Sequence, residues 1–142
     1  MTVELTDEMV SALSSAFDDH APCIVGTASG SGAPDVSYRG SVFAFDREHL
    51  AFWERAKGET LRNIEENSNV VVLYRNSATR QGWRFYGVAQ ILKDGELRQQ
   101  IMERVHPLEL AQDPDRTGYA VLMRIDRVRA RSETIMERGE ER

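Results

Sequence analysis

The feature that most restricts the fold is a succession of short strand-like segments joined mainly by short polar turns. Apolar and β-branched residues alternate with polar ones, or run together, in segments that predict strands at 23–29, 36–45, 50–54, 70–76, 81–93 and 119–131. Helical spacing of apolar residues is confined to 6–17, 59–67 and 96–105. Strands that follow one another through short turns favour antiparallel pairing over an alternating parallel sheet. The predicted fold is therefore mainly β, with six antiparallel strands closing into a barrel and a few short helices.

The size and composition of the chain set its class. Its 142 residues suit one domain, 1–142, in which the charged segment 131–142 is expected to form a frayed tail. A hydrophobic fraction of 41% and a charged fraction of 29% are typical of soluble globular proteins, and the net charge of −5 argues against nucleic-acid binding. Neither a signal peptide nor a membrane span is expected, so a cytoplasmic location is the default.

No catalytic or metal-binding constellation stands out. His20, His49 and His106 are scattered without a partner at metal-ligand spacing, so no metal site is predicted. Cys23 is the only cysteine and begins an apolar strand, where a small buried side chain is the expected role. The glycine-rich segment 26–32 joins two strands and predicts a hairpin turn. A chain without catalytic residues of its own indicates a protein that takes its chemistry from a cofactor.

The segment 51–72 offers a candidate phosphate site. It predicts a strand, a polar turn and a helix start, where unpaired backbone N–H groups and the helix dipole attract anions. Lys57 adds a positive charge, Gly58 permits close approach of the backbone, and Thr60 adds a hydroxyl. The alternative is an ordinary strand–turn–helix connection with a solvated lysine.

Arg39 is a second candidate for anion binding. It lies in a predicted strand of otherwise small and apolar residues, where an unpaired guanidinium would be costly. The alternative is an arginine at the barrel rim that forms an ion pair with Asp35 or Glu54.

The order of these pieces resembles the pyridoxamine 5′-phosphate oxidase-like family, the FMN-binding split barrels, over about 6–131. The resemblance rests on a leading helix followed by CIVGTAS, GAPDVSYRG, AFWERAKGETLRNIEENSNVVVLY, GWRFYGVAQIL and AVLMRIDRVRAR. It implies a homodimer of six-stranded split barrels with FMN bound between the subunits. The FMN-binding residues that it implies are Arg39, Gly40, Ser41, Val42, Phe52, Trp53, Lys57, Gly58, Thr60, Gln81 and Trp83. The segment 106–118 of the second subunit is expected to cover the flavin.

The implied activity is that of an FMN-dependent oxidoreductase, with hydride transfer through flavin N5 to or from an unidentified small molecule. One alternative is a flavin-binding or stress-response protein without turnover, and another is a deazaflavin-dependent reductase. The oxidases carry an Arg-Lys pair at the helix start where this chain has Glu59 and Thr60, and a C-terminal segment that it lacks. True pyridoxamine phosphate oxidase activity is therefore not expected.

Overall fold

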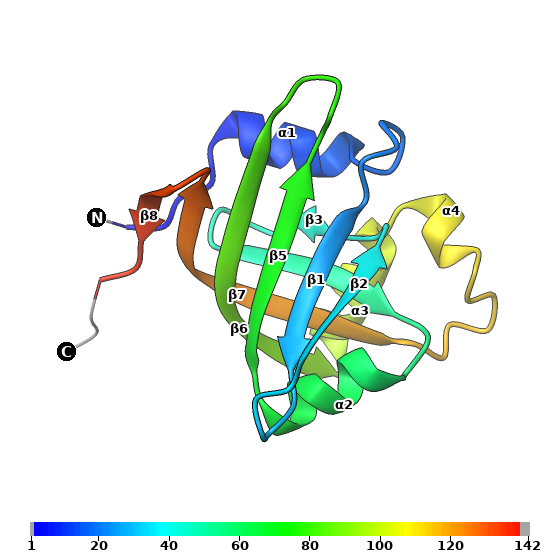
Figure 1. Ribbon diagram of the computed structural model, residues 1–142. Coiled ribbons are helices and arrows are strands. Elements are labelled where there is room, and N and C mark those ends of the chain that lie inside the picture. Colours follow the sequence, from blue (N-terminus) through cyan, green and yellow to red (C-terminus); the bar gives the residue numbers. More distant parts are fainter. Residues whose placement is uncertain (1, 140–142) are drawn as a thin grey trace.

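The computed structural model describes residues 2–139, and β-strands make up most of its regular structure (Figure 1). The strands are β1 (Cys23–Ala28), β2 (Pro34–Arg39), β3 (Phe43–Ala44), β4 (His49–Glu54), β5 (Asn69–Arg75), β6 (Gly82–Leu92), β7 (Tyr119–Ala130) and β8 (Glu133–Glu137). The helices are α1 (Asp7–Ser15), α2 (Glu59–Glu66), α3 (Glu96–Arg104) and the short α4 (Pro107–Leu110).

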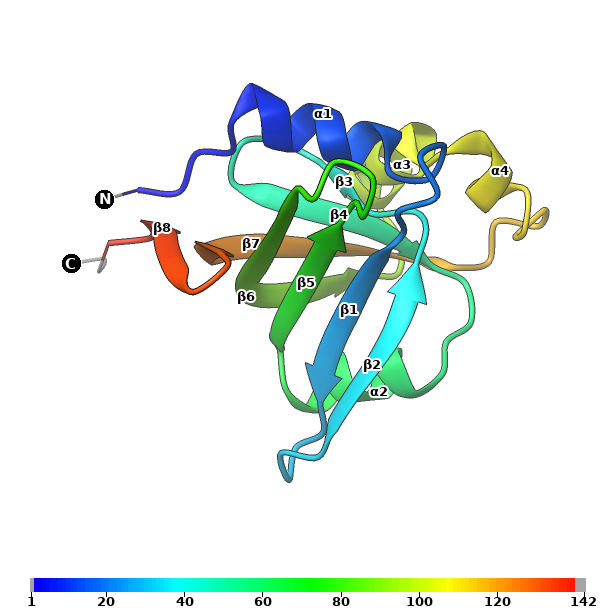
Figure 2. The same cartoon turned by 45° about the horizontal axis from the view of Figure 1, so that its top comes forward.

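All strand pairs are antiparallel, and the sheet runs in the order β2-β1-β5-β6-β7-β4-β3, with β8 paired to β7. The sheet curls into an open barrel (Figure 2). Its two end strands, β2 and β3, are consecutive in the chain, so residues 40–42 cross the opening between them. This arrangement confirms the predicted class, a mainly β, antiparallel split barrel with a few short helices.

The predicted strand 36–45 is wrong as one element, because its two halves pair with opposite edges of the sheet. Arg39 is the last residue of β2 paired with β1, whereas Phe43 pairs with Ala51 of β4. The strand count accordingly exceeds the predicted six.

The segment 131–142 is also not frayed throughout. Residues Glu133–Glu137 form β8 against β7, with Arg127 directly opposite Glu137, and a cross-strand pair of opposite charges favours this pairing. Its last three residues lie outside the described range. The loop predicted over 106–118 contains α4, which Pro107 begins and the His106 ring caps by accepting the Leu108 N–H at 3.1 Å.

The core has two parts, one on each side of β4. Inside the barrel, Leu50 and Phe52 pack with residues of α1, β1, β5, β6 and β7. On the other side, Ala51 and Trp53 pack under Ile101 of α3. Because both faces are covered, β4 has no exposed side, which holds the residues at its end firmly. No helix within residues 2–139 is both long and apolar enough to cross a membrane.

Candidate functional site

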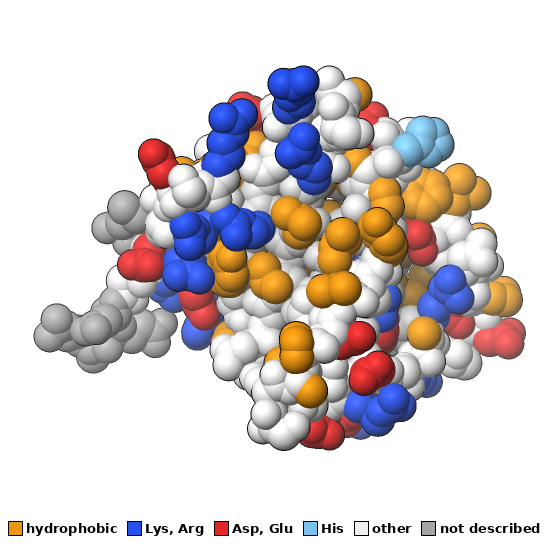
Figure 3. Space-filling model, viewed as in Figure 1, with side chains coloured by type: hydrophobic (Ala, Val, Ile, Leu, Met, Phe, Trp, Pro, Cys, Tyr) orange, Lys and Arg blue, Asp and Glu red, His pale blue; other side chains and the backbone are white. Residues whose placement is uncertain are grey.

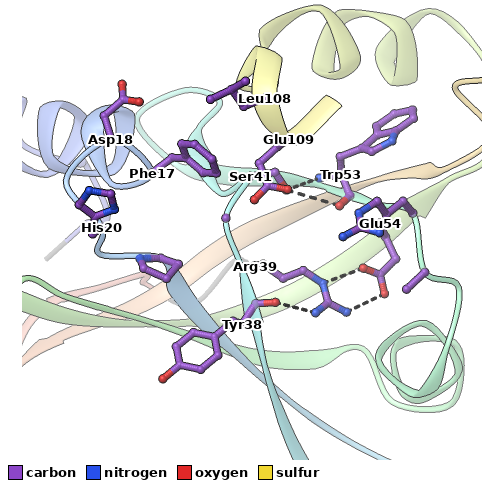
Figure 4. Close-up of a pocket in the computed structure, with 14 residues that line it drawn as sticks. Phe17, Asp18, His20, Tyr38, Arg39, Ser41, Trp53, Glu54, Leu108 and Glu109 are labelled. Atoms are coloured by element: carbon purple, nitrogen blue, oxygen red, sulfur yellow. Dashed lines mark hydrogen bonds and ion pairs between the residues drawn. The ribbon is translucent and has the colours of Figure 1, made fainter. Parts of the chain in front are cut away.

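A pocket of about 680 Å³ lies between the end of α1, strand β2, the end of β4 and helix α4 (Figure 4). Its volume falls within the range of roughly 300–1,000 Å³ that small-molecule and cofactor sites occupy. Residues from these four elements form its wall, among them Phe17, Arg39, Gly40, Ser41, Trp53, Glu54, Leu108 and Glu109.

Arg39 and Glu54 form a bidentate ion pair in this wall. Arg39 Nε donates to Glu54 Oε1 at 2.7 Å and Nη2 donates to Oε2 at 2.9 Å, while Glu54 is only 1% exposed. Arg39 Nη1 also donates to Ser37 Oγ and to the carbonyl oxygen of Tyr38. Of the two roles considered for Arg39, the ion pair with Glu54 is the one present here. The pair leaves the guanidinium neutralised and with little capacity for a further anion. Its contact with FMN stays a prediction.

Thr60 continues this network to α2. Its hydroxyl lies 3.1 Å from Ser37 Oγ and the residue is 4% exposed, so the side chain points toward β2. The hydroxyl therefore fastens α2 to the sheet, and the expected contact of Thr60 with a phosphate would fall to its backbone N–H.

The start of α2 is open. Gly58 occupies the N-cap position without a side-chain cap, and a Cβ placed there would meet no atom within 4 Å. Lys57, in the left-handed region at φ 53°, holds its Nζ 4.2 Å from the centre of the Tyr119 ring. Because Arg55 and Ala56 line the pocket just before this turn, a cation and free helix N–H groups follow the pocket wall directly.

The crossing segment, residues 40–42, borders the pocket through Gly40 and Ser41. Ser41 Oγ accepts the Trp53 N–H at 3.0 Å and donates to the Trp53 carbonyl at 3.4 Å. A Cβ at Gly40 would overlap the carboxylate of Glu109, so the glycine leaves room for this side chain in its present position. Val42, in contrast, is buried in the barrel core.

Trp53 is fixed by a carboxylate that sequence reasoning missed. Trp53 Nε1 donates to Asp113 Oδ2 at 2.8 Å, and the backbone N–H groups of Gly118 and Thr117 donate to the same carboxylate. Burial alone would raise the pKa of Asp113, but these hydrogen bonds outweigh it and hold the pKa below its ordinary value. The turn-forming run DPDRTG was the only signal in the sequence. The segment 106–118 also contributes Leu108 and Glu109 to the pocket of its own chain. Its expected position over the partner's flavin stays a prediction.

Comparison with known proteins identifies the family of this chain. The family model for pyridoxamine 5′-phosphate oxidase matches residues 5–132. The chain belongs to the pyridoxamine 5′-phosphate oxidase family. Comparison with curated proteins found no match.

Solved structures share the fold of this family member. A proposed pyridoxamine 5′-phosphate oxidase from Lactobacillus delbrueckii is 24% identical with a TM-score of 0.72, over 91% of this chain and 96% of that chain. An FMN-binding protein from Syntrophomonas wolfei is 15% identical with a TM-score of 0.66, over 86% and 85%. A protein named F420 reductase is 18% identical with a TM-score of 0.54, over 77% and 89%.

Besides Val42, three residues expected at the flavin site of this pyridoxamine 5′-phosphate oxidase family member lie elsewhere in the chain. Phe52 points into the barrel core. Trp83 is 8% exposed and stacks on Tyr74 with ring centres 5.6 Å apart. Gln81 donates to Glu8 of α1 and, with Trp83, borders a second cavity. The structure therefore brings Arg39, Gly40, Ser41 and Trp53 together but does not bring Gln81 and Trp83 to them.

The cysteine and histidines add no reactive site. Cys23 is 1% exposed, and burial raises the pKa of its thiol to about 12. His106 lies against Asp18 at 3.0 Å and His49 against Asp46 at 2.8 Å. Among residues 2–139, no group of three or more His, Cys, Asp or Glu side chains could hold a metal ion.

Proposed function

We propose that this protein is an FMN-binding oxidoreductase that acts on a small molecule. The observation that carries the proposal is a cofactor-sized pocket whose wall leads into the uncapped start of α2 beside Lys57. Membership of the pyridoxamine 5′-phosphate oxidase family supports it. FMN needs a site for its phosphate and a partly apolar space for its ring. The start of α2 would supply the first, and the pocket next to it would supply the second.

The first turn of α2 and Lys57 would hold the phosphate, because free N–H groups and an ammonium attract a dianion. The crossing segment would lie beside the ring, and Trp53, fixed by Asp113, would form the wall behind it. The Arg39–Glu54 pair would hold β2 and β4 at their present separation. When bound, FMN supplies two-electron redox chemistry through its N5 atom, which the chain's own residues do not provide.

The proposal includes a homodimer. Val36 and Tyr38 of β2 are 69% and 68% exposed on the outer face of the sheet. The register places Ile24 beside Tyr38, and Leu73 beside Ile24, so the apolar side chains form one patch (Figure 3). An exposed patch of this kind commonly marks an interface. A second copy is the favoured occupant, because Gln81 and Trp83 lie apart from the pocket and could join a flavin site only from another subunit.

A visible absorption spectrum with added FMN, read alongside the size-exclusion mass, tests the assignment first. We expect a yellow dimer, or one that shifts the flavin spectrum. Lys57→Ala should weaken FMN binding about tenfold, because a charge-assisted contact contributes about 1.5–3 kcal/mol. Arg62→Ala is the matched control, since it removes one exposed cation from the same helix and should change the affinity less than about twofold. A protein that ignores FMN, or equal affinity in Lys57→Ala, would reject the assignment.

Two further titrations separate the alternatives. Reduction of bound FMN by nicotinamide nucleotides supports an oxidoreductase, whereas bound flavin that no donor reduces supports a binding protein without turnover. Tighter binding of F420 than of FMN would favour a deazaflavin reductase, the function named for one protein of similar fold.

A further inference from the structure

The two ends of the candidate pocket differ in charge. Arg55 lines the end nearest α2, and Lys57 follows it in the turn before that helix. Asp18 and Glu109 line the end formed by α4 and the segment after α1, where His20 adds an imidazole. Figures 1 and 2 both show α1 and α4 on one side of the open barrel and α2 on the other. The pocket therefore has positive charge where we place the FMN phosphate and negative charge at its far end.

Glu109 is the carboxylate at this end that lacks a partner. Within residues 2–139 its side chain forms no hydrogen bond or ion pair, although the residue is half-buried. Asp18 differs, because it lies 3.0 Å from His106 Nε2. His106 Nδ1 accepts the Leu108 N–H, so the ring proton lies on Nε2 and is donated to Asp18. A half-buried carboxylate without a partner favours a ligand that brings a cation or a strong donor.

The side chains around Glu109 are largely apolar. A Cβ at Gly40 would lie 3.2 Å from Phe17 Cδ2, so the Phe17 ring and the Glu109 carboxylate border the same point of the crossing segment. The Phe17 and His106 ring centres are 4.3 Å apart, which keeps α4 against the end of α1. Leu108 also lines the pocket and is 60% exposed. Figure 4 shows Phe17, Leu108 and Glu109 around the same space, which suits a carbon skeleton with one charged group.

We propose that this end of the pocket selects a small apolar molecule that carries a positive charge, which Glu109 binds. The inference rests on the proposed function, because it takes FMN to fill the remainder of the pocket and the selected molecule to be the substrate. Glu109 lies beside Gly40 of the crossing segment, where we place the flavin ring, so a cation bound to it would lie next to that ring. A phosphate or carboxylate at the same position would be repelled by Glu109 and Asp18.

Calorimetric titration of the FMN-saturated protein with three ligands of similar shape tests the proposal. Tryptamine carries an ammonium on its indole ring, tryptophol carries a hydroxyl, and indole-3-acetate carries a carboxylate. We expect tryptamine to bind at least about tenfold more tightly than indole-3-acetate, because a charge-assisted contact takes the place of a repulsion. Tryptophol should have an intermediate affinity.

Glu109→Gln removes the charge and nearly preserves the size of the side chain. It should weaken tryptamine binding about tenfold, strengthen indole-3-acetate binding, and change tryptophol binding less than about twofold. Leu108→Ser should weaken tryptamine and tryptophol by a similar factor, because it removes apolar wall and no charge. Asp115→Asn is the matched control, since it removes an exposed carboxylate that follows α4 and does not line the pocket, and it should bind all three ligands like the parent.

Unchanged tryptophol binding in Glu109→Gln shows that the pocket is intact, so a loss of tryptamine binding there reports the charge alone. Three results would overturn the proposal: no tryptamine binding, equal affinity for tryptamine and indole-3-acetate, or unchanged tryptamine affinity in Glu109→Gln. FMN occupancy is read from the visible spectrum of the same samples. A parent protein that ignores FMN would reject the proposed function, and the same titrations without FMN would still show whether Glu109 selects a cation.

Discussion

The two cavities contain the same kind of cation in opposite electrostatic settings. In the first, Arg39 forms an ion pair with Glu54, and the guanidinium, which has five N–H groups, donates four hydrogen bonds. In the second, which Gln81 and Trp83 border, Arg84 and Arg129 are opposite each other on adjacent strands. Within residues 2–139, their side chains donate only to backbone carbonyl oxygens. An arginine next to a cavity is therefore not by itself an anion site, because its partners decide whether charge remains for a ligand.

The two groups of charges should also differ in how much they contribute to stability. Paired charges in the first cavity connect β2, β4 and α2, so their loss should affect folding. Charges in the second cavity that lack an ion pair within residues 2–139 should contribute little to folding.

The largest expected effect comes from Glu54→Ala. It leaves Arg39 largely buried without its carboxylate, so we expect the free energy of unfolding to fall by about 3 kcal/mol. Glu133→Ala, the matched change at the second cavity, should alter the free energy of unfolding by less than about 0.5 kcal/mol. Urea unfolding of both variants measures the difference. Similar losses in the two would show that the cavities do not differ as described.

An intermediate effect is expected from Asp113→Asn, which replaces the charged acceptor behind Trp53. We expect the free energy of unfolding to fall by about 1–3 kcal/mol at neutral pH. Because the folded-state pKa of Asp113 is lowered, its contribution is fully present above the ordinary pKa of 3.8 and disappears as pH falls through the folded-state value. Below about pH 4, unfolding midpoints should therefore fall more steeply with decreasing pH in the parent than in Asp113→Asn. Parallel curves would contradict this role.

The smallest effect is expected from Arg75→Gln, which removes one cation from the border of the second cavity. Stability should stay within about 0.5 kcal/mol of the parent, and any gain should be greatest at low salt, where repulsion among the arginines is least screened. Thermal unfolding at about 20 mM and 500 mM salt provides the measurement. A clear loss of stability would mean that Arg75 has a supporting contact after all.

The sequence predicted the positions of helices and strands more accurately than it predicted which strands and side chains contact one another. Alternation and turn residues located most strands, and Thr6 caps α1 as its type suggests, accepting the Met9 N–H at 3.1 Å. Local patterns do not show which strands meet, so the division of 36–45 and the pairing of β8 were missed. Residues near Lys57 could be proposed as a site because strand, turn and helix are adjacent in sequence. Asp113 could not, because its contact with Trp53 spans 60 residues.

The pairing of β4 with β7 determines when this chain can fold during synthesis. Ala51 pairs with Leu122, so β4 has only the two-residue β3 beside it until the last long strand is made. In a ribosome-bound chain that ends before Tyr119, one edge of β4 and one edge of β6 would have no partner strand. Contacts of such separation slow folding, because a long loop must be ordered before they form. Nascent chains of this protein should therefore resist proteases only after β7 has emerged.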